Sequence, residues 1–258
     1  MVWWITKFWL LNISEAFIWK VPPETVLLSA GELHVWRFPL EVDKNLYQRY
    51  WQYLSADEQQ RAQRFVFEKD RVQSVVSRGV LRSLLGLYLK CPADSVALSA
   101  TALGKPFCRD HVLPFNVSHS HGWAVVVVGQ VESLGVDIEW VQPDLDWQPL
   151  SSRFFSAAEH QQLLRQPATQ QRNAFFCCWT RKEAVVKAIG EGLFFALQNF
   201  EVSVSPDQPA RLLAVKDQSE LVDQLGLISG WLTESYPLCV AVGGEVKALR
   251  AYEWCHVT

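Results

Sequence analysis

Two carboxylates lie two residues apart in the sequence G-V-D-I-E-W-V, at Asp137 and Glu139. Residues 135–141 are a predicted strand, so both carboxylates project from one face while the apolar residues between them anchor the other face in a core. Neighbouring negative charges repel each other unless a cation or a basic group lies between them, and hard oxygen ligands of this kind suit Mg²⁺. A D-x-E pattern alone equally fits the solvent-facing edge of a strand.

A second pair of charged residues lies in the sequence W-T-R-K-E-A-V-V-K at residues 179–187. Glu183 and Lys187 are four residues apart, so on a predicted helix they share one face. This spacing fits an ordinary surface ion pair. It also allows Glu183 to complete a metal site or to act as a base, while Lys187 meets the negative charge of a phosphate.

Groups that could bind phosphate are found in the sequence F-N-V-S-H-S at residues 115–120. Ser118 and His119 lie at the end of a predicted strand, where a hydroxyl and an imidazole can both contact phosphate oxygens. A serine hydrolase is a possible alternative, but the chain has no G-x-S-x-G motif. His119 and His121 also suggest zinc, although they lack the further spaced Cys or His residues of a zinc site.

The overall composition excludes several classes of protein. The net charge of −3 gives no reason to expect nucleic acid as a partner. No stretch approaches the ~18 uncharged apolar residues of a membrane helix, so no integral membrane segment is predicted. The six cysteines form no C-x-x-C pair, and we interpret them as reduced thiols of a cytoplasmic protein.

The N-terminal segment, residues 1–30, is rich in tryptophan. Four of the twelve tryptophans lie in the first twenty residues. Lys7 interrupts the apolar run and no small-residue cleavage site follows, which argues against a signal peptide. We interpret the segment as a packed extension. Contact with a membrane interface, contact with a partner and a misassigned start are the alternatives, and the role of the segment stays open.

The elements that must position these residues follow the order strand, helices, strands twice along the chain. Strands are predicted at residues 32–38 and 123–129, with helices at 56–67 and 69–90. Helices at 157–165 and 171–189 come next, followed by strand-like runs at 200–204, 210–215, 229–235, 237–242 and 248–254 and a short helix near 219–225. Capping boxes of Ser55 with Glu58 and of Ser156 with Glu159 mark two helix starts. The order predicts two α+β halves, at residues 31–132 and 133–258.

The three segments that carry chemistry resemble, together, the signature blocks of the 4′-phosphopantetheinyl transferase superfamily. Their order and spacing are similar to those of its larger, surfactin-synthetase-activating (Sfp-type) branch. The resemblance extends to R-F-V-F-E-K-D at 64–70, G-K-P at 104–106 and R-F-F-S-A-A-E at 153–159. It covers roughly residues 32–255, and the co-occurrence of three chemically meaningful blocks makes it specific.

The resemblance implies a fold and a reaction. The fold would be an α+β pseudo-dimer of two similar halves with the active site and coenzyme A in the cleft between them. Asp137, Glu139 and Glu183 would hold Mg²⁺ together with the pyrophosphate oxygens. The enzyme would move phosphopantetheine from coenzyme A to a serine of an apo acyl or peptidyl carrier protein and release 3′,5′-ADP. Glu183 would deprotonate that serine, directly or through a water on the metal, with Lys187 and His119 as the other catalytic residues.

The resemblance also implies which residues bind coenzyme A. These are Arg61, Gly104, Lys105, Asn116, Ser118, His119 and Lys187, with Arg61 at the 3′-phosphate and Asn116 shaping the phosphate loop. The chain departs from close relatives at Glu58, where they can carry a lysine. Arg78 and Arg82 are either further phosphate contacts or part of a solvated helix face.

Two other classes of function remain open from the residues. One is a non-catalytic, coenzyme A-binding scaffold that retains the fold. The other is a different Mg²⁺-dependent phosphoryl-transfer enzyme, although the absence of a G-x-x-x-x-G-K-[ST] motif argues against a P-loop protein. The larger branch tends to be monomeric and broad in its acceptor. Carriers of fatty-acid, polyketide and nonribosomal peptide synthesis are therefore all possible partners, and the docking surface for an acidic carrier is not located by the sequence.

Overall fold

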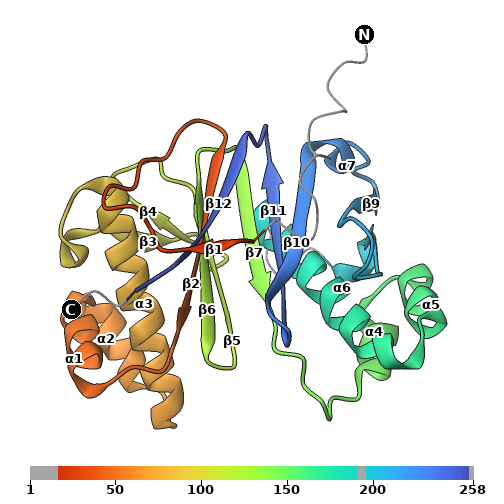
Figure 1. Cartoon of the computed structure of the whole chain (residues 1–258), viewed down its shortest axis with the longest axis horizontal. Coiled ribbons are helices and arrows are strands. Elements are labelled where there is room, and N and C mark those ends of the chain that lie inside the picture. The colour runs from red at the N-terminus through yellow and green to blue at the C-terminus, as the bar shows by residue number, and fades with distance from the viewer. Residues whose placement is uncertain (1–16, 191–195, 256–258) are drawn as a thin grey trace.

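Two sheets stand face to face at the centre of the chain, and helices cover their outer sides (Figure 1). The computed structural model describes residues 17–190 and 196–255. Helices α1 to α3 lie against the larger sheet, and α4 to α6 lie on the other side of the molecule. This arrangement confirms the predicted α+β fold of two halves.

The first sheet has five strands in the order β1-β12-β2-β6-β5. The strands are β1 (Trp19–Lys20), β12 (Ala248–Glu253), β2 (Glu32–Pro39), β6 (Trp123–Gly129) and β5 (Phe115–Ser120). The helices on its outer side are α1 (Lys44–Tyr53), α2 (Ala56–Gln63) and α3 (Glu68–Leu89), and a small hairpin of β3 (Leu98–Ala100) and β4 (Pro106–Cys108) follows them.

The second sheet has three strands in the order β10-β11-β7. They are β10 (Leu225–Thr233), β11 (Tyr236–Gly243) and β7 (Ser133–Ile138). The helices of this half are α4 (Trp147–Phe154), α5 (Ala157–Arg165), α6 (Ala168–Ile189) and α7 (Leu221–Gln224), and β8 (Phe200–Val202) pairs with β9 (Leu212–Val215). No helix in the described part of the chain is both long and apolar enough to span a bilayer.

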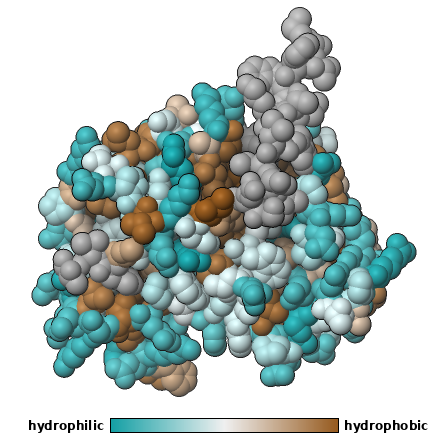
Figure 2. Space-filling model, viewed as in Figure 1, coloured by the Kyte–Doolittle hydropathy of each residue, from teal (hydrophilic) through white to brown (hydrophobic). Residues whose placement is uncertain are grey.

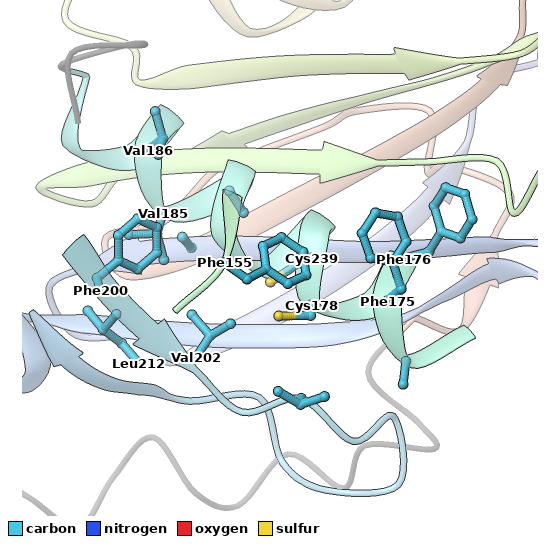
Figure 3. Close-up of a cluster of buried hydrophobic side chains, with 14 of the residues drawn as sticks. Phe155, Phe175, Phe176, Cys178, Val185, Val186, Phe200, Val202, Leu212 and Cys239 are labelled. Atoms are coloured by element: carbon cyan, nitrogen blue, oxygen red, sulfur yellow. The ribbon is translucent and has the colours of Figure 1, made fainter. Parts of the chain in front are cut away.

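The alternation of side chains along the strands builds three cores. Leu33 and Val35 of β2 point between the sheets, where they join the core that contains Val136 of β7. Trp36 and Phe38 point the other way and pack under α1 and α3. The third core lies between α6 and strands β8 and β11, and Figure 3 shows its phenylalanine, valine and cysteine side chains. Each sheet therefore has a buried inner face and an outer face covered by helices.

Several elements differ from the predicted ones. Helices α1 and α4 were not predicted, and α2 ends at Gln63 rather than at residue 67. The three residues 65–67 instead form an exposed apolar turn before α3. Strand β7 ends at Ile138, and α6 begins at Ala168. Both capping boxes are present as predicted, since each serine accepts from the backbone of its glutamate and each glutamate accepts in return.

The last strand crosses between the two halves. β12 pairs in parallel with β2 on one side and with β1 on the other, so it lies within the first sheet although it belongs to residues 133–258. The boundary between residues 132 and 133 stays a prediction.

Trp3, Trp4 and Trp9 of the N-terminal segment lie outside the described residues. Trp19 of the same segment packs against the guanidinium of Arg37, whose Cζ lies 4.7 Å from the centre of the Trp19 ring.

One face of the surface is visible in Figure 2, in the same orientation as Figure 1. Hydrophobic residues on this face form small groups separated by hydrophilic ones. A hollow of about 490 Å³ lies beside α1 and α3, with Tyr50, Leu87, Lys90 and Trp254 among its lining residues, and none of the predicted site residues lines it.

Candidate active site

A buried polar cluster forms where β5, β7 and α6 meet. Lys187 of α6 donates to Asp137 of β7, with 2.6 Å between Nζ and Oδ1. The same ammonium donates to the hydroxyl of Ser118 on β5 over 3.0 Å, and that hydroxyl donates to Asp137 Oδ1 over 2.9 Å. The structure therefore brings together one residue from each of the three predicted segments.

The close approach of α6 to β7 depends on Gly135. A Cβ at this position would lie 2.1 Å from the carbonyl oxygen of Ala184 and 2.4 Å from the backbone nitrogen of Ala188. Only a residue without a side chain allows these two backbones to touch. Because Glu183 and Lys187 are one helical turn apart on α6, this contact places both of them near Asp137 of β7.

The three carboxylates of the site resist ionisation. Burial raises the pKa of Asp137, and the neighbouring Lys187 opposes that rise. Burial and the negative charge of Asp137 raise the pKa of Glu139 to about 7. Burial and Asp137 also raise the pKa of Glu183, while Lys187 lowers it. A cation placed among these groups would relieve their mutual repulsion.

The donor set fits Mg²⁺ in its chemistry. The three predicted ligands are carboxylates, and Asp137 Oδ2 is buried without a hydrogen-bond partner among the described residues. In the described parts of the chain, however, no three His, Cys, Asp or Glu side chains are grouped closely enough to hold a metal ion. Asp137, Glu139 and Glu183 thus influence one another's charge without forming a closed site, and Lys187 supplies the positive charge at Asp137.

Strand β5 is joined to β7 through side chains. Asn116, Ser118 and Ser120 each accept a hydrogen bond from a backbone N–H of the segment 136–140, over distances of 2.8, 3.4 and 3.0 Å. Ser120 also donates to Glu139 over 2.9 Å between Oγ and Oε2. We did not predict a role for Ser120 from the sequence, although its spacing of two from Ser118 places both hydroxyls on one face of a strand.

His119 lies between the two serines and is exposed. Partial removal of its ring from water and the positive charge of Lys187 lower the pKa of His119, while Asp137 raises it. A neutral imidazole beside the cluster can donate or accept a hydrogen bond according to its tautomer. The roles predicted for His119 in binding and catalysis stay predictions.

The side chain of Lys105 binds backbone carbonyl groups of the protein. Its ammonium donates to the carbonyl oxygens of Leu134 and Lys187, over 3.0 and 2.6 Å. These contacts link the start of β7 to the last turn of α6. Gly104 precedes Lys105 with a φ of 85°, a conformation that glycine adopts without strain.

Three arginines of the first half were considered as phosphate contacts. Arg61 is exposed at the end of α2, whereas Arg78 and Arg82 form ion pairs with Glu58. Arg82 is only 4% exposed, donating to Glu58 over 2.8 Å and to the carbonyl oxygen of Val96 over 2.9 Å. The interpretation of Arg82 as part of a solvated helix face is therefore wrong, because its guanidinium is buried and binds Glu58 and backbone carbonyl oxygens. Its interpretation as a phosphate contact stays a prediction. Glu58 does more than cap its helix, since Arg78 also lies 3.5 Å from it.

Comparison with known proteins places the chain in a family. A model described as the 4′-phosphopantetheinyl transferase superfamily matches residues 133–241, and one for the N-terminal region of 4′-phosphopantetheinyl transferase matches residues 41–132. The relative HetI from Nostoc sp. is 36% identical over 75% of this chain and 83% of its own length. Psf-1 from Bacillus pumilus is 35% identical over 67% of this chain and 75% of its own, and Sfp from Bacillus subtilis is 29% identical over 66% and 74%. All three carry the name 4′-phosphopantetheinyl transferase.

A fold of two α+β halves, with carboxylates and a lysine at their junction, and these similarities define one class of enzyme. The chain belongs to the 4′-phosphopantetheinyl transferase superfamily. Within it, the match to a separate N-terminal region and the similarity to Sfp and psf-1 place the chain in the larger, Sfp-type branch.

Proposed function

We propose that the chain transfers the phosphopantetheine arm of coenzyme A to a serine of an apo acyl or peptidyl carrier protein and releases 3′,5′-ADP. The observation that carries this proposal is the cluster of Lys187, Asp137 and Ser118, which combines a phosphate-binding cation with carboxylates at the junction of the halves. Membership of the family supports the same reaction.

The pyrophosphate of coenzyme A would meet Lys187, Ser118 and His119. Lys187 is 28% exposed, so its ammonium can turn from Asp137 towards an anionic substrate. Arg61, exposed on α2, would bind the 3′-phosphate. Gly104, Lys105 and Asn116 would shape this site instead, because Lys105 and Asn116 already hold backbone groups of β7.

Mg²⁺ would be held by Asp137, Glu139 and Glu183, and when bound it would neutralise negative charge on the pyrophosphate. The side chains of the protein perform the remaining steps. Ser118 and Ser120 hold two of the carboxylates, and Lys187 stabilises charge on the departing 3′,5′-ADP.

Glu183 would act as the base. The carrier serine attacks the β-phosphorus, its proton passes to the Glu183 carboxylate, and the bond to the 5′-phosphate of 3′,5′-ADP breaks. Burial and Asp137 raise the pKa of Glu183, which makes its carboxylate a stronger base than an exposed glutamate. The in-line geometry would be provided by the binding of both substrates at the junction of the halves.

The reaction is tested by intact-mass spectrometry of apo carrier proteins incubated with the enzyme, coenzyme A and Mg²⁺. The proposal expects each acceptor to gain the mass of one phosphopantetheine arm, and to lose that gain with EDTA or with Glu183→Gln. A chain that binds coenzyme A but modifies no carrier from fatty-acid, polyketide or peptide synthesis would be a scaffold, and the proposal would be wrong.

The setting of the reaction is also a proposal. All six cysteines are free thiols, which suits a reducing compartment such as the cytoplasm. We propose that the enzyme acts as a monomer, because the cluster described above is built from one chain. Size-exclusion chromatography with light scattering tests this, and a stable dimer would contradict it.

A further inference from the structure

Ser120 makes a pair of hydrogen bonds that leaves its hydroxyl with one possible orientation. Its Oγ accepts from the backbone N–H of Trp140 over 3.0 Å and donates to Glu139 Oε2 over 2.9 Å. A hydroxyl has a single proton, so once the N–H occupies a lone pair the proton is free to point at the carboxylate. Ser120 is partly buried, which limits competition from water.

Ser118 repeats this arrangement two residues earlier. Its Oγ accepts from the backbone N–H of Ile138 over 3.4 Å and donates to Asp137 Oδ1 over 2.9 Å. In both cases one serine binds a carboxylate and the N–H of the residue that follows it. The two serines of β5 therefore hold Asp137 on β7 and Glu139 directly after it in the same way.

The strand end that carries Ser120 is itself held in place. His121 stacks on the indole of Trp140, with 4.0 Å between ring centres and 13° between planes. The hydroxyl of Tyr236 donates to the carbonyl oxygen of His121 over 2.9 Å. His121, which follows Ser120, is thus held by Trp140 and Tyr236 of the second half, so the hydroxyl is held by more than its own bonds.

We propose that Ser120 is a positioning residue, which orients Glu139 for the cation that the three carboxylates would share. This inference rests on the proposed function. Ser120 touches neither substrate nor the reacting atoms, and it acts only through Glu139. Asp137 has Lys187 as a second partner, whereas Ser120 is the hydrogen-bond partner that the described residues provide for the Glu139 carboxylate.

The test compares Ser120→Thr with Ser120→Val in the full chain, because threonine and valine have the same shape and differ in the hydroxyl. The readout is the Kd for Mn²⁺, measured by electron paramagnetic resonance of the free ion. Loss of a group that orients a metal ligand typically weakens binding about tenfold or more, so we expect about a tenfold higher Kd for Ser120→Val and an unchanged Kd for Ser120→Thr. Ser83→Ala, which removes a hydroxyl from α3 in the other half, serves as the control.

The outcomes separate the two proposals. If Glu139→Gln weakens Mn²⁺ binding but Ser120→Val does not, the positioning role is wrong and the proposed function stands. If the wild-type chain binds no Mn²⁺, the metal site fails and the positioning role fails with it. Thermal unfolding of each variant is measured alongside. A lower Tm for both Ser120 variants with equal Kd values would assign Ser120 to stability alone and overturn the inference.

Discussion

Helix α3 in the first half and helix α6 in the second are both 22 residues long, and each follows a short helix that begins with a capping box. In each half the capping-box glutamate forms an ion pair with a basic residue of the long helix, Glu58 with Arg82 and Glu159 with Lys182, both at 2.8 Å. Each basic residue lies 14 positions after the first residue of its helix, from 68 to 82 and from 168 to 182.

The two long helices differ at the positions that carry chemistry. Where α6 has Glu183 and Lys187, α3 has Ser83 and Leu87. The ion pair between a capping-box glutamate and the long helix is thus present in both halves. The predicted catalytic pair of Glu183 and Lys187 has a counterpart of neither charge in α3. In each half the glutamate and the basic residue therefore hold the two helices together, while the residues one and five positions further along are available for function.

The largest difference between the halves should appear in activity. Glu183→Gln removes the proposed base and a proposed metal ligand while keeping the size of the side chain. We expect carrier modification to fall at least ~10³-fold, the combined effect of lost proton transfer and lost charge stabilisation. Ser83→Ala changes the equivalent position of α3 in the other half, and it should leave the rate unchanged. Single-turnover mass spectrometry measures both rates, and a similar loss in the two variants would contradict a catalytic role confined to α6.

The two ion pairs should differ in their contribution to stability. Lys182 and Glu159 are 0% and 1% exposed, so Glu159→Gln leaves a buried ammonium without its negative partner and should cost ~3 kcal/mol of unfolding free energy. Glu58→Gln should cost only ~1 kcal/mol, because its pair is nearer the surface and Arg82 keeps three carbonyl acceptors. Glutamine preserves both capping boxes. Urea unfolding gives the two values, and equal costs would contradict the asymmetry.

Each half has a glycine where a long helix makes a close contact, Gly79 within α3 and Gly135 against α6. Gly135→Ala should push α6 away from β7 and cost ~2 kcal/mol of stability, with a fall in activity. Gly79→Ala in α3 should also destabilise, since its Cβ would lie 2.4 Å from that of Tyr50, but the folded protein should keep its turnover rate. Calorimetry and the mass-based assay separate these effects. Full activity in Gly135→Ala would mean that the contact of α6 with β7 does not set the site.

The smallest expected effect concerns pH. The pKa of Glu139 is raised to about 7, so its carboxyl is mostly protonated at pH 6 and mostly ionised at pH 8. Because a metal ligand must lose its proton, Mn²⁺ affinity should rise about tenfold between these values in the wild-type chain. Glu139→Gln should flatten this dependence, and Glu58→Gln in the other half should not. An equally steep rise in Glu139→Gln would assign the dependence to another group.

Much of this arrangement could be predicted from the sequence where the pattern is local. The alternation in β2, the two capping boxes and the end of α6 at Gly190 depend on neighbouring residues. Asp137, Ser118 and Lys187 were also predicted as one site, through the resemblance of their segments to a family. Their contact in the structure agrees with that resemblance.

The remainder depends on contacts between residues far apart in the chain. Helix α1 is an exception, because a local pattern for it exists and was missed. It begins at an Asp43 cap, and Leu46, Tyr47, Tyr50 and Trp51 recur at helical spacing and pack on the core of the first half. The anchoring roles of Arg82 and Lys105 follow from carbonyl oxygens of other segments, which no local pattern reveals. Ser120 was missed for the same reason, because β5 and β7 belong to different sheets.

The position of β12 has a consequence for synthesis. This strand is made after every other strand, yet it lies between β1 and β2 in the first sheet. While the ribosome is still translating the second half, β2 has β6 on one side and an open edge on the other. An open edge of this kind can pair with other chains. The first half therefore completes its sheet only after the second half has been synthesised, so the two halves should not fold as separable pieces.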